Sequence, residues 1–382
     1  MAVGLRKKKF INLYFRTIHS YGWVVRFKII MEVSVNETSK YILEEKATIF
    51  DALKAMDGTS HDSQTLFIIN QDAIMVGTLT DGDIRRGIIS GISVSDTVRK
   101  VMHTSFKSVK EGDDMALVLK KYRDEQIYFV PVLDKEGHIL RVCNLLKYRN
   151  VLPVDVVLMA GGKGERLRPL TEKTPKPLLP VGDKAIIDHN IDRLISYGVN
   201  HISVTVNYLK EQLEEHFAEP HYGVQVQTVR EPKFLGTIGS IKFVKEFYND
   251  TVLVMNSDVF TNINFEDFYL HFIEHDAVMS VAAIPYTVSV PYGIFDLNGR
   301  DINGLIEKPT YNYFANAGIY LIKRSALDEI PVDTFFNATD LIEKLIAEGK
   351  KVIRFPLNGT WIDIGNPQEY QKANELVKHM RW

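Results

Sequence analysis

The stretch that decides the fold is Val157-Leu158-Met159-Ala160-Gly161-Gly162-Lys163-Gly164-Glu165-Arg166-Leu167-Arg168-Pro169-Leu170-Thr171, which Pro175-Lys176-Pro177 follows closely. Its apolar start predicts a buried strand that runs into a loop with three glycines. Glycine backbone can approach phosphate oxygens without interference from a Cβ atom. Arg166 offers a planar fork for such oxygens and Lys176 a point charge. The stretch is not a P-loop, because Gly-Lys-Ser/Thr is missing, and it does not match the dinucleotide-binding fingerprint, whose glycines open directly into a helix.

From Pro153 onward, apolar segments alternate with amphipathic ones. The expected strands are Val154–Met159, His201–Val206, Val224–Val229 and Val252–Met255, and the expected helices are Ile186–Tyr197, Leu209–Phe217 and Thr237–Phe247. Continuous apolar strands separated by amphipathic helices indicate a parallel, doubly wound α/β sheet. Ligands of such sheets bind outside the carboxyl ends of the strands, so motifs that directly follow strands are candidate site residues.

Two carboxylates are candidate metal ligands. Asp258 follows a predicted strand in Met255-Asn256-Ser257-Asp258, and Asp363 lies in Trp361-Ile362-Asp363-Ile364-Gly365-Asn366-Pro367. One or two carboxylates, together with phosphate oxygens and water, are the ligands that Mg²⁺ accepts. The alternative is that Asp258 is an N-cap after the strand and that Asp363 is a turn residue.

Taken together, these motifs resemble those of the sugar-1-phosphate nucleotidylyltransferases, and the similarity extends from residue 154 to near the C-terminus. The resemblance implies a mostly parallel, Rossmann-like sheet and an enzyme that transfers NMP from an NTP to a sugar 1-phosphate, with release of pyrophosphate. It implies that Arg166 grips the pyrophosphate and that Lys176 neutralises the α-phosphoryl group. It further implies a catalytic role for Asp258, which would bind the cofactor Mg²⁺ together with Asp363.

The same resemblance assigns contacts to both substrates. The residues that would bind the nucleotide are Ala160, Gly161, Gly162, Gly164, Glu231, Gly236 and Thr237. The residues that would bind the sugar phosphate are Glu307, Lys308, Asn316 and Gly318. A carboxylate at position 231 could accept both N1–H and the exocyclic amine of guanine, which favours GTP slightly. UTP, CTP, dTTP or ATP is an alternative donor, and a catalytically silent nucleotide-sensing subunit is an alternative from another class of protein.

Two weakly similar segments occupy about residues 36–150 and repeat with a period of about 60 residues. We expect helix, strand, turn, strand and helix in each, with strands at Leu66–Ile69, Met75–Leu79, Ile127–Leu133 and Ile139–Val142. This pattern resembles an α+β tandem pair of cystathionine-β-synthase-type (CBS) domains, which implies a regulatory or oligomerising role.

The first repeat contains Gly77-Thr78-Leu79-Thr80-Asp81-Gly82-Asp83, which matches the nucleotide-binding signature of CBS domains. The match implies that Thr80 and Asp83 bind a regulatory nucleotide. The alternative is that these two residues cap the helix that follows. CBS pairs commonly stack face to face, so the resemblance also implies a homo-oligomer.

Composition excludes several classes of protein. The 382 residues have a net charge of −2, but residues 1–30 contain seven Lys and Arg and no Asp or Glu, so the remaining chain carries −9. An acidic body argues against a nucleic-acid surface. No apolar run reaches the roughly 18 residues of a membrane span. The single cysteine, Cys143, excludes a disulfide framework within the chain and indicates a reducing compartment, so we expect a cytoplasmic protein.

We therefore expect a basic extension at residues 1–32, a tandem CBS pair at 33–150 and a nucleotidyltransferase domain at 153–382. Lys7-Lys8-Lys9 and the apolar residues that follow resemble an export signal, but Arg16 and His19 interrupt the apolar run. The other interpretations are a membrane-surface segment, a flexible tail, or translation that begins at Met31. By resemblance, the expected product is an NDP-sugar, used for surface-glycan or nonulosonic-acid precursors.

Overall fold

The computed structural model describes residues 39–58 and 64–379. The chain divides into two compact units, with the boundary between Arg149 and Asn150. The basic extension expected at residues 1–32 lies outside the described residues. Among the residues that are described, no helix is long and apolar enough to cross a membrane.

Two three-stranded sheets, β1-β2-β3 and β4-β5-β6, form the N-terminal unit. In each sheet the first two strands are parallel and the last two are antiparallel. The elements are β1 Ile42–Glu44, α3 Ile49–Gly58, β2 Thr65–Ile69, β3 Met75–Thr80, α4 Asp81–Ile89, β4 Val109–Lys110, α5 Met115–Asp124, β5 Phe129–Leu133 and β6 Ile139–Asn144. The common order of strands in the two sheets is the structural counterpart of the predicted repeat.

The second repeat departs from the expected pattern after β6. A helix follows β3, but residues 145–153, all of which are described, form no helix. The Asn144 side chain accepts hydrogen bonds from the backbone nitrogens of Leu146 and Lys147, at 3.0 and 3.2 Å. Asn264 and Asn366 make the same two bonds where helices do start, so the Asn144 cap begins a turn that does not continue as a helix before Pro153 restricts the chain. The helix expected at the end of the second repeat was therefore a wrong prediction.

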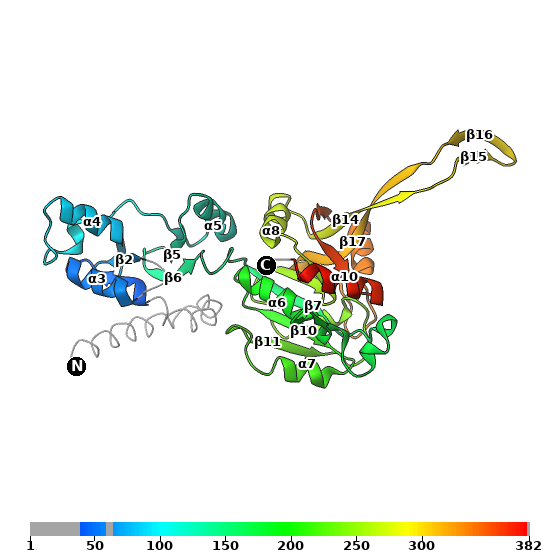
Figure 1. The fold of residues 1–382 in the computed structure, drawn as a ribbon, viewed down its shortest axis with the longest axis horizontal. Helices are drawn as coiled ribbons and strands as arrows, with labels where there is room; N and C mark the ends of the chain where they lie inside the picture. Colours follow the sequence, from blue (N-terminus) through cyan, green and yellow to red (C-terminus); the bar gives the residue numbers. More distant parts are fainter. Residues whose placement is uncertain (1–38, 59–63, 380–382) are drawn as a thin grey trace. The chain divides into compact units, whose positions relative to one another are not determined.

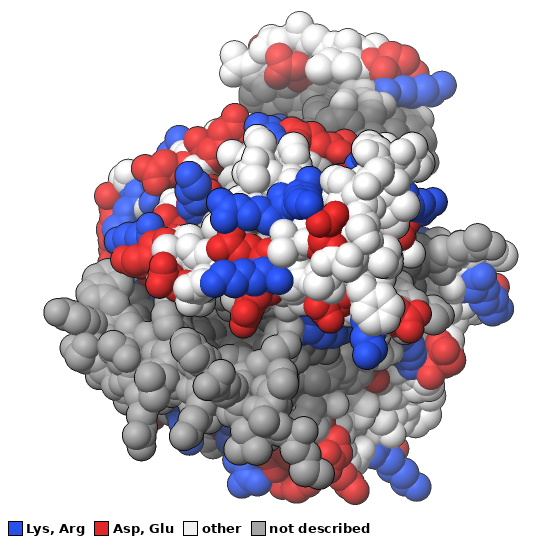
Figure 2. All heavy atoms as spheres, turned by 90° about the vertical axis from the view of Figure 1, so that its left-hand side faces the viewer, with Lys and Arg blue, Asp and Glu red and all other residues white. Residues whose placement is uncertain are grey.

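The two small sheets share a core. Tyr41, Phe67 and Met75 from the first repeat cluster with Leu133 from the second, and the Met75 nitrogen donates a 2.9 Å hydrogen bond to the Gly137 carbonyl. Figure 2 shows acidic and basic side chains interleaved on the face of this unit that is turned toward the viewer. Ion pairs at i, i+4 spacing in this unit include Arg85–Asp81 and Lys100–Asp96.

A seven-stranded sheet of order β11-β10-β7-β12-β17-β14-β18 forms the centre of the C-terminal unit (Figure 1). Its strands are β7 Val154–Met159, β10 Ile202–Val206, β11 Val226–Arg230, β12 Thr251–Asn256, β14 Met279–Ser289, β17 Thr310–Lys323 and β18 Val352–Pro356. Neighbouring strands are parallel except around β17, which is antiparallel to both β12 and β14. The mostly parallel α/β sheet is confirmed, and the antiparallel strand within it is an addition to the prediction.

Helices and short strands surround this sheet. The helices are α6 Ile186–Ser196, α7 Lys210–His216, α8 Phe265–Glu274, α9 Ala338–Ala347 and α10 Pro367–Val377, and the short strands are β8 Pro180–Val181, β9 Lys184–Ala185, β13 Val259–Thr261 and β19 Trp361–Asp363. Apolar residues of the sheet, such as Val254 and Ile322, pack with Leu341 and Leu345 of α9 in one fully buried cluster.

The helix predicted at Thr237–Phe247 is instead a short 3₁₀ segment, Gly239–Phe243. The backbone nitrogens of Ile238 and Gly239 both donate to the Phe336 carbonyl, at 3.1 Å each. These bonds to a distant segment fix the chain in a non-helical path just where the helix was expected to start.

Beyond the sheet, β14 and β17 continue as a two-stranded ribbon (Figure 1). Ile284–Ser289 pairs with Thr310–Ala315, and at the far end β15 Ile294–Asn298 pairs with β16 Asp301–Ile306. We call residues 284–315 the ribbon. Because β14 runs in the same direction as β12, the ribbon leaves the sheet at the edge where β12 ends.

Candidate active site

The glycine loop and Asp258 lie at the same edge of the large sheet. Gly161 follows β7 by two residues and Asp258 follows β12 by two residues, and these two strands are parallel neighbours. The strand order also reverses here, since β10 and β11 lie on one side of β7 and all later strands lie on the other. Ligands of doubly wound sheets bind at such a switch point, outside the carboxyl ends of the strands.

Lys176 and the two candidate metal ligands meet at this edge. The Lys176 ammonium, on a residue that is only 8% exposed, donates a hydrogen bond to Oδ2 of Asp258 and forms an ion pair with it. Pairing of β13 with β19 places Asp363 opposite Val259, the residue after Asp258. The Ile364 nitrogen also donates a 3.1 Å hydrogen bond to the Asp258 carbonyl.

Arg166 completes this group of charges. Its guanidinium lies against Gly365, where an added Cβ atom would be only 2.8 Å from Nη2. Its positive charge acts on Asp363, as does that of Lys176. We call Arg166, Lys176, Asp258 and Asp363 the charge cluster. The structure thus brings together the four residues that the sequence motifs singled out for phosphate and metal binding.

The two carboxylates of the charge cluster repel each other. Burial raises the pKa of Asp363, and the negative charge of Asp258 raises it further, while Lys176 and Arg166 lower it in part. A divalent cation between the two would relieve this repulsion, and carboxylate oxygens are the donors that hard cations prefer. The donor set therefore fits a divalent metal ion held by Asp258 and Asp363.

Two glycines of the loop are required by close packing. An added Cβ atom at Gly161 would be 2.5 Å from Oε1 of Glu231. Gly164 has φ of +63°, and the Thr171 hydroxyl donates a 2.8 Å hydrogen bond to its carbonyl. By contrast, nothing lies within 4 Å of a Cβ atom built at Gly162. Gly162 therefore presents open backbone at the carboxyl edge. Ala160, two residues earlier, is held to β10, since its nitrogen donates to the Thr205 carbonyl at 3.1 Å.

Glu231 lies at the end of β11 and is 5% exposed. Burial raises the pKa of Glu231, and hydrogen-bonding groups of Ser240, Asn207 and the Leu235 backbone offset part of that rise. Its Oε2 is buried and has no hydrogen-bond partner of good geometry. The Glu231 carboxyl group thus packs against Gly161, and its Oε2 can still accept a hydrogen bond.

Gly236 and Thr237, also expected to bind the nucleotide, lie in the loop after β11, which contacts the start of α9. Gly236 has φ of +79°, and an added Cβ atom there would meet the Phe336 carbonyl at 2.6 Å. The Thr237 hydroxyl accepts a 2.9 Å hydrogen bond from the Ala338 nitrogen, and the Thr237 nitrogen donates to Oδ1 of Asn337 at 3.2 Å. In this structure Thr237 therefore supports the helix start, and its hydroxyl proton is its remaining donor.

Of the residues expected to bind the sugar phosphate, Asn316 and Gly318 lie at the carboxyl edge. The Gly318 nitrogen donates to Oδ1 of Asn316 at 2.9 Å, and an added Cβ atom at Gly318 would be 2.6 Å from Nδ2 of Asn256. Glu307 and Lys308 lie instead on the ribbon, where both are exposed. Within the described part of the chain, no hydrogen bond or ion pair connects them to the charge cluster.

Two buried polar residues of α6 hold the segment that carries Asp258, and the sequence interpretation missed both. Nδ2 of Asn190 donates to the Ser257 carbonyl at 3.4 Å and to the Val259 carbonyl at 2.8 Å, one on each side of Asp258. The Arg193 guanidinium donates to the carbonyls of Thr261 and Ile263. The available signal was that these two polar residues interrupt the apolar face of an amphipathic helix, three residues apart.

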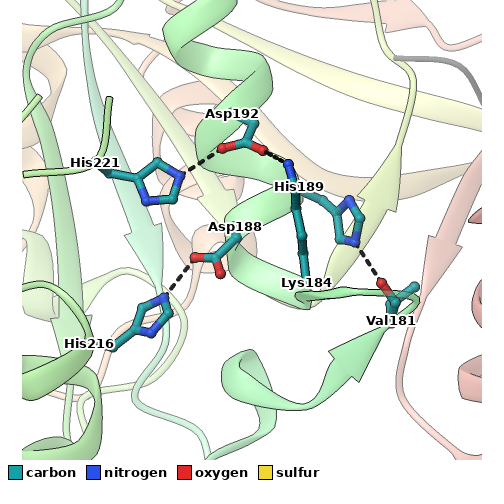
Figure 3. Close-up of polar contacts among 7 residues, drawn as sticks. All are labelled: Val181, Lys184, Asp188, His189, Asp192, His216 and His221. Carbon is teal, nitrogen blue, oxygen red and sulfur yellow. Dashed lines mark hydrogen bonds and ion pairs between the residues drawn. The ribbon is translucent and has the colours of Figure 1, made fainter. Parts of the chain in front are cut away.

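Charged contacts hold the same helix from its other side (Figure 3). His216 contacts Asp188 at 2.8 Å, whereas Asp192 contacts both His221 at 2.7 Å and Lys184 at 2.6 Å. The hydrogen bond to Asp188 raises the pKa of His216. Helix α6 is thus fixed between these contacts and the backbone segment that carries Asp258.

In the N-terminal unit, Thr80 and Asp83 form a capping box at the start of α4. Oδ2 of Asp83 accepts hydrogen bonds from the Thr80 nitrogen at 2.8 Å and hydroxyl at 2.6 Å, and Oδ1 accepts one from Arg86 at 2.6 Å. Burial alone would raise the pKa of Asp83, but these hydrogen bonds outweigh it and lower the pKa. The geometry shows the capping role, and both carboxylate oxygens are already engaged.

The large unit matches a known family. A family model described as nucleotidyl transferase matches residues 155–379. The putative mannose-1-phosphate guanyltransferase of Sulfolobus acidocaldarius is 30% identical over 225 residues, or 58% of this chain and 62% of that protein. The bifunctional protein GlmU of Methanococcus maripaludis is 31% identical over 231 residues, or 58% of this chain and 54% of that protein.

A solved structure, HddC from Yersinia pseudotuberculosis, is 24% identical with a TM-score of 0.47, and the match covers 59% of this chain and 99% of that one. The chain spans only between half and two thirds of the length of the two curated relatives. The segment that the family model matches contains the glycine loop, the charge cluster and most of the seven-stranded sheet. Because the nucleotidyl transferase model matches residues 155–379, which is more than half of the chain, the chain belongs to the nucleotidyl transferase family.

Proposed function

We propose that this chain transfers NMP from an NTP to a sugar 1-phosphate, giving an NDP-sugar and pyrophosphate. The observation that carries the proposal is the charge cluster, which lies beside the glycine loop at the carboxyl edge of a nucleotidyl transferase sheet. Two cations and two carboxylates within one site suit two polyanionic substrates and a divalent cation. The named relatives also include a guanyltransferase that takes mannose 1-phosphate.

In the proposed reaction an oxygen of the sugar 1-phosphate attacks the α-phosphorus of the nucleotide. A new oxygen–phosphorus bond forms as the bond from the α-phosphorus to the bridging oxygen breaks, and its electron pair leaves with pyrophosphate. Both substrates are already anionic, so no general base is required, and the barrier is charge repulsion. Lys176 would face the α-phosphoryl group, and Arg166 would hold the departing pyrophosphate.

Asp258 and Asp363 would hold the divalent cation, which we take to be Mg²⁺. When bound, it supplies neutralisation of phosphate charge in addition to that of Lys176 and Arg166. Asn190 keeps the Asp258 backbone in place through bonds to the carbonyls on both sides. Positioning of this kind is a large part of what such a site contributes.

For the donor we propose GTP. Glu231 retains acceptor capacity behind the glycine loop, and guanine offers the two donors that a carboxylate can accept. The printed name of the Sulfolobus relative supports the same choice. The NDP-sugar would serve synthesis of surface glycans or nonulosonic-acid precursors.

A panel of the four common ribonucleoside triphosphates and dTTP, each with several sugar 1-phosphates, tests this function through pyrophosphate release. We expect release with GTP and with a hexose or amino-sugar 1-phosphate, and none without the sugar. Preference for another NTP would correct the donor and leave the reaction class standing. Nucleotide binding without release in any combination would contradict the reaction and favour the silent, nucleotide-sensing alternative.

For the N-terminal unit we propose the role of a CBS pair that regulates the enzyme. The support is that its two sheets have the same strand order and share a core. A nucleotide bound at Thr80 and Asp83 would have to replace the hydrogen bonds of the capping box.

We expect AMP, ADP or ATP to change the rate of pyrophosphate release by the full chain at least about threefold. Thr80→Val should abolish this response and leave the basal rate unchanged, since a capping loss of about 1 kcal/mol stays local. Thr65→Val, on the neighbouring strand β2, is the matched control. A rate that responds to none of the three nucleotides would contradict the regulatory role.

A further inference from the structure

The segment that joins the glycine loop to Lys176 has little regular structure of its own. Residues 165–175, which we call the connecting segment, form two short 3₁₀ turns, Glu165–Leu167 and Leu170–Glu172. Because such a segment makes few backbone hydrogen bonds within itself, its shape depends on contacts with other parts of the fold. It contains Arg166 and leads directly into Lys176, the two cations that the proposed function assigns to the phosphates.

Two side chains around the start of α7 hold three successive carbonyls of the connecting segment. The Tyr208 hydroxyl donates to the Thr171 carbonyl at 3.0 Å and to the Glu172 carbonyl at 3.3 Å. Since a hydroxyl has one proton, Tyr208 shares it between these two acceptors. Nε2 of Gln212 donates to the next carbonyl, that of Lys173, at 2.9 Å. The connecting segment is therefore fastened to the chain that follows β10.

The contact at Thr171 continues to the glycine loop. Thr171 is fully buried, and its hydroxyl donates the 2.8 Å hydrogen bond to the Gly164 carbonyl. A Cβ atom built at Gly164 would lie 2.9 Å from Cγ2 of Thr171 and 3.1 Å from Cβ of Lys176. Both residues thus pack against Gly164, so a shift of Thr171 would displace the glycine loop.

The backbone next to Tyr208 is strained. Leu209 has φ of +48° and ψ of 38°, in the left-handed region that a residue with a Cβ atom rarely adopts. Strain of this kind persists where the surrounding structure over-determines it, and it clusters at functional sites. Here the strained residue lies between the side chain that holds Thr171 and the helix that carries Gln212.

We propose that Tyr208 is a positioning residue for the donor nucleotide and that it acts through Thr171 and Gly164. By holding the connecting segment, it keeps the glycine loop in the conformation that accepts phosphate oxygens before the nucleotide arrives. A loop that is ordered in advance costs less to order on binding, so the benefit falls on nucleotide affinity. This role rests on the proposed function, which supplies the nucleotide as the ligand.

Tyr208→Phe removes the hydroxyl and keeps the ring. We expect it to raise the KM for the nucleotide about fivefold, the scale for one lost hydrogen bond, because the loop must then be ordered by the nucleotide itself. Both kcat and the KM for the sugar 1-phosphate should stay within about twofold, since the bound nucleotide restores the loop. Pyrophosphate release with each substrate varied in turn gives these values.

Tyr122→Phe is the matched control, because the Tyr122 hydroxyl also donates to a backbone carbonyl, that of Ser108, at 3.1 Å in the N-terminal unit. This variant should change neither KM nor kcat. A merely structural role of Tyr208 would lower the active fraction of enzyme, and therefore kcat, with both KM values unchanged. That result, or an equal rise in both KM values, would overturn the positioning role.

A double-mutant cycle tests whether Tyr208 acts through Thr171. Thr171→Val keeps the shape of the buried side chain and removes the hydrogen bond to Gly164, so the nucleotide KM should rise at least as much as in Tyr208→Phe. If the two residues act along one route, the combined variant should have a KM within about twofold of that of Thr171→Val. Two effects that multiply in full would overturn the route through Thr171.

Hydrogen exchange of the free protein separates this role from the proposed function, because it requires neither turnover nor a substrate. The backbone amides of residues 161–175 should exchange at least about threefold faster in Tyr208→Phe than in the unaltered protein or in Tyr122→Phe. Unchanged exchange would overturn the positioning role even in an active enzyme. Faster exchange in a protein that releases no pyrophosphate would contradict the proposed function alone, and calorimetric titration with GTP would then replace the KM measurement.

Discussion

Replacing Lys176 with methionine is expected to lower the rate of pyrophosphate release at least about a hundredfold, the scale for loss of one preorganised electrostatic group. Methionine keeps most of the side-chain length and removes the charge, so the loss isolates electrostatics from packing. Lys176 is buried and its ammonium is already held at the carboxyl edge beside Asp258, which leaves it little motion to lose on reaction. The measurement is kcat from pyrophosphate release at saturating substrates.

Lys173→Met is the matched control, because this lysine belongs to the same segment but is exposed to solvent. We expect that variant to keep the rate of the unaltered enzyme within about twofold, as is usual for an exposed side chain away from the chemistry. A Lys176→Met enzyme with a similar rate would exclude Lys176 from phosphoryl neutralisation.

Replacing Asp258 with asparagine is expected to remove both activity and metal binding. Asparagine preserves the shape of the side chain but gives up one of two negative charges, so turnover should again fall at least about a hundredfold. The second measurement needs no substrate. In the unaltered protein Mg²⁺ should raise the midpoint of thermal unfolding, because it binds the folded state alone, and in Asp258→Asn that rise should vanish. Asp183→Asn, an exposed acidic position, is the control.

The pH dependence of this metal effect follows from Asp363. Its pKa in the folded protein is raised above the ordinary value of 3.8. The stability that it contributes is therefore fully present below that ordinary value and is lost as pH rises through the raised pKa. Protons and Mg²⁺ compete for the same oxygens, so stabilisation by Mg²⁺ should grow over that pH range. If the stabilisation by Mg²⁺ does not depend on pH, or is unchanged in Asp258→Asn, the assignment of the metal to Asp258 and Asp363 is wrong.

Local signals were sufficient to predict the chemistry-bearing parts of the molecule. The apolar run of β7, its glycine loop and Lys176 are contiguous in sequence, and Asp258 directly follows another apolar strand. Strand ends collect at one edge of a parallel sheet whatever the details of the connections. For that reason the glycine loop and Asp258 could be placed at one edge from sequence, whereas the inclusion of Asp363 rested on the resemblance to the family.

Parts that depend on distant segments could not be predicted in the same way. The antiparallel direction of β17 is set by its neighbours β12 and β14, and nothing within its own residues specifies it. The 3₁₀ segment at Gly239–Phe243 replaces a helix because the carbonyl of Phe336, almost a hundred residues later, takes up the backbone donors. The role of Asn190 likewise becomes evident only from its hydrogen bonds to the carbonyls on either side of Asp258.

The packing of Glu231 against Gly161 makes the glycine loop and the proposed donor-recognition residue depend on each other. The carboxyl group occupies the space that any side chain at position 161 would need. A larger residue at 161 would demand a smaller one at 231, and a smaller residue at 231 alone would leave a void beneath the glycine loop. The two positions should therefore vary together in evolution. Under the proposed function, any redesign of the donor nucleotide that begins at Glu231 must also rebuild the loop that cradles the phosphates.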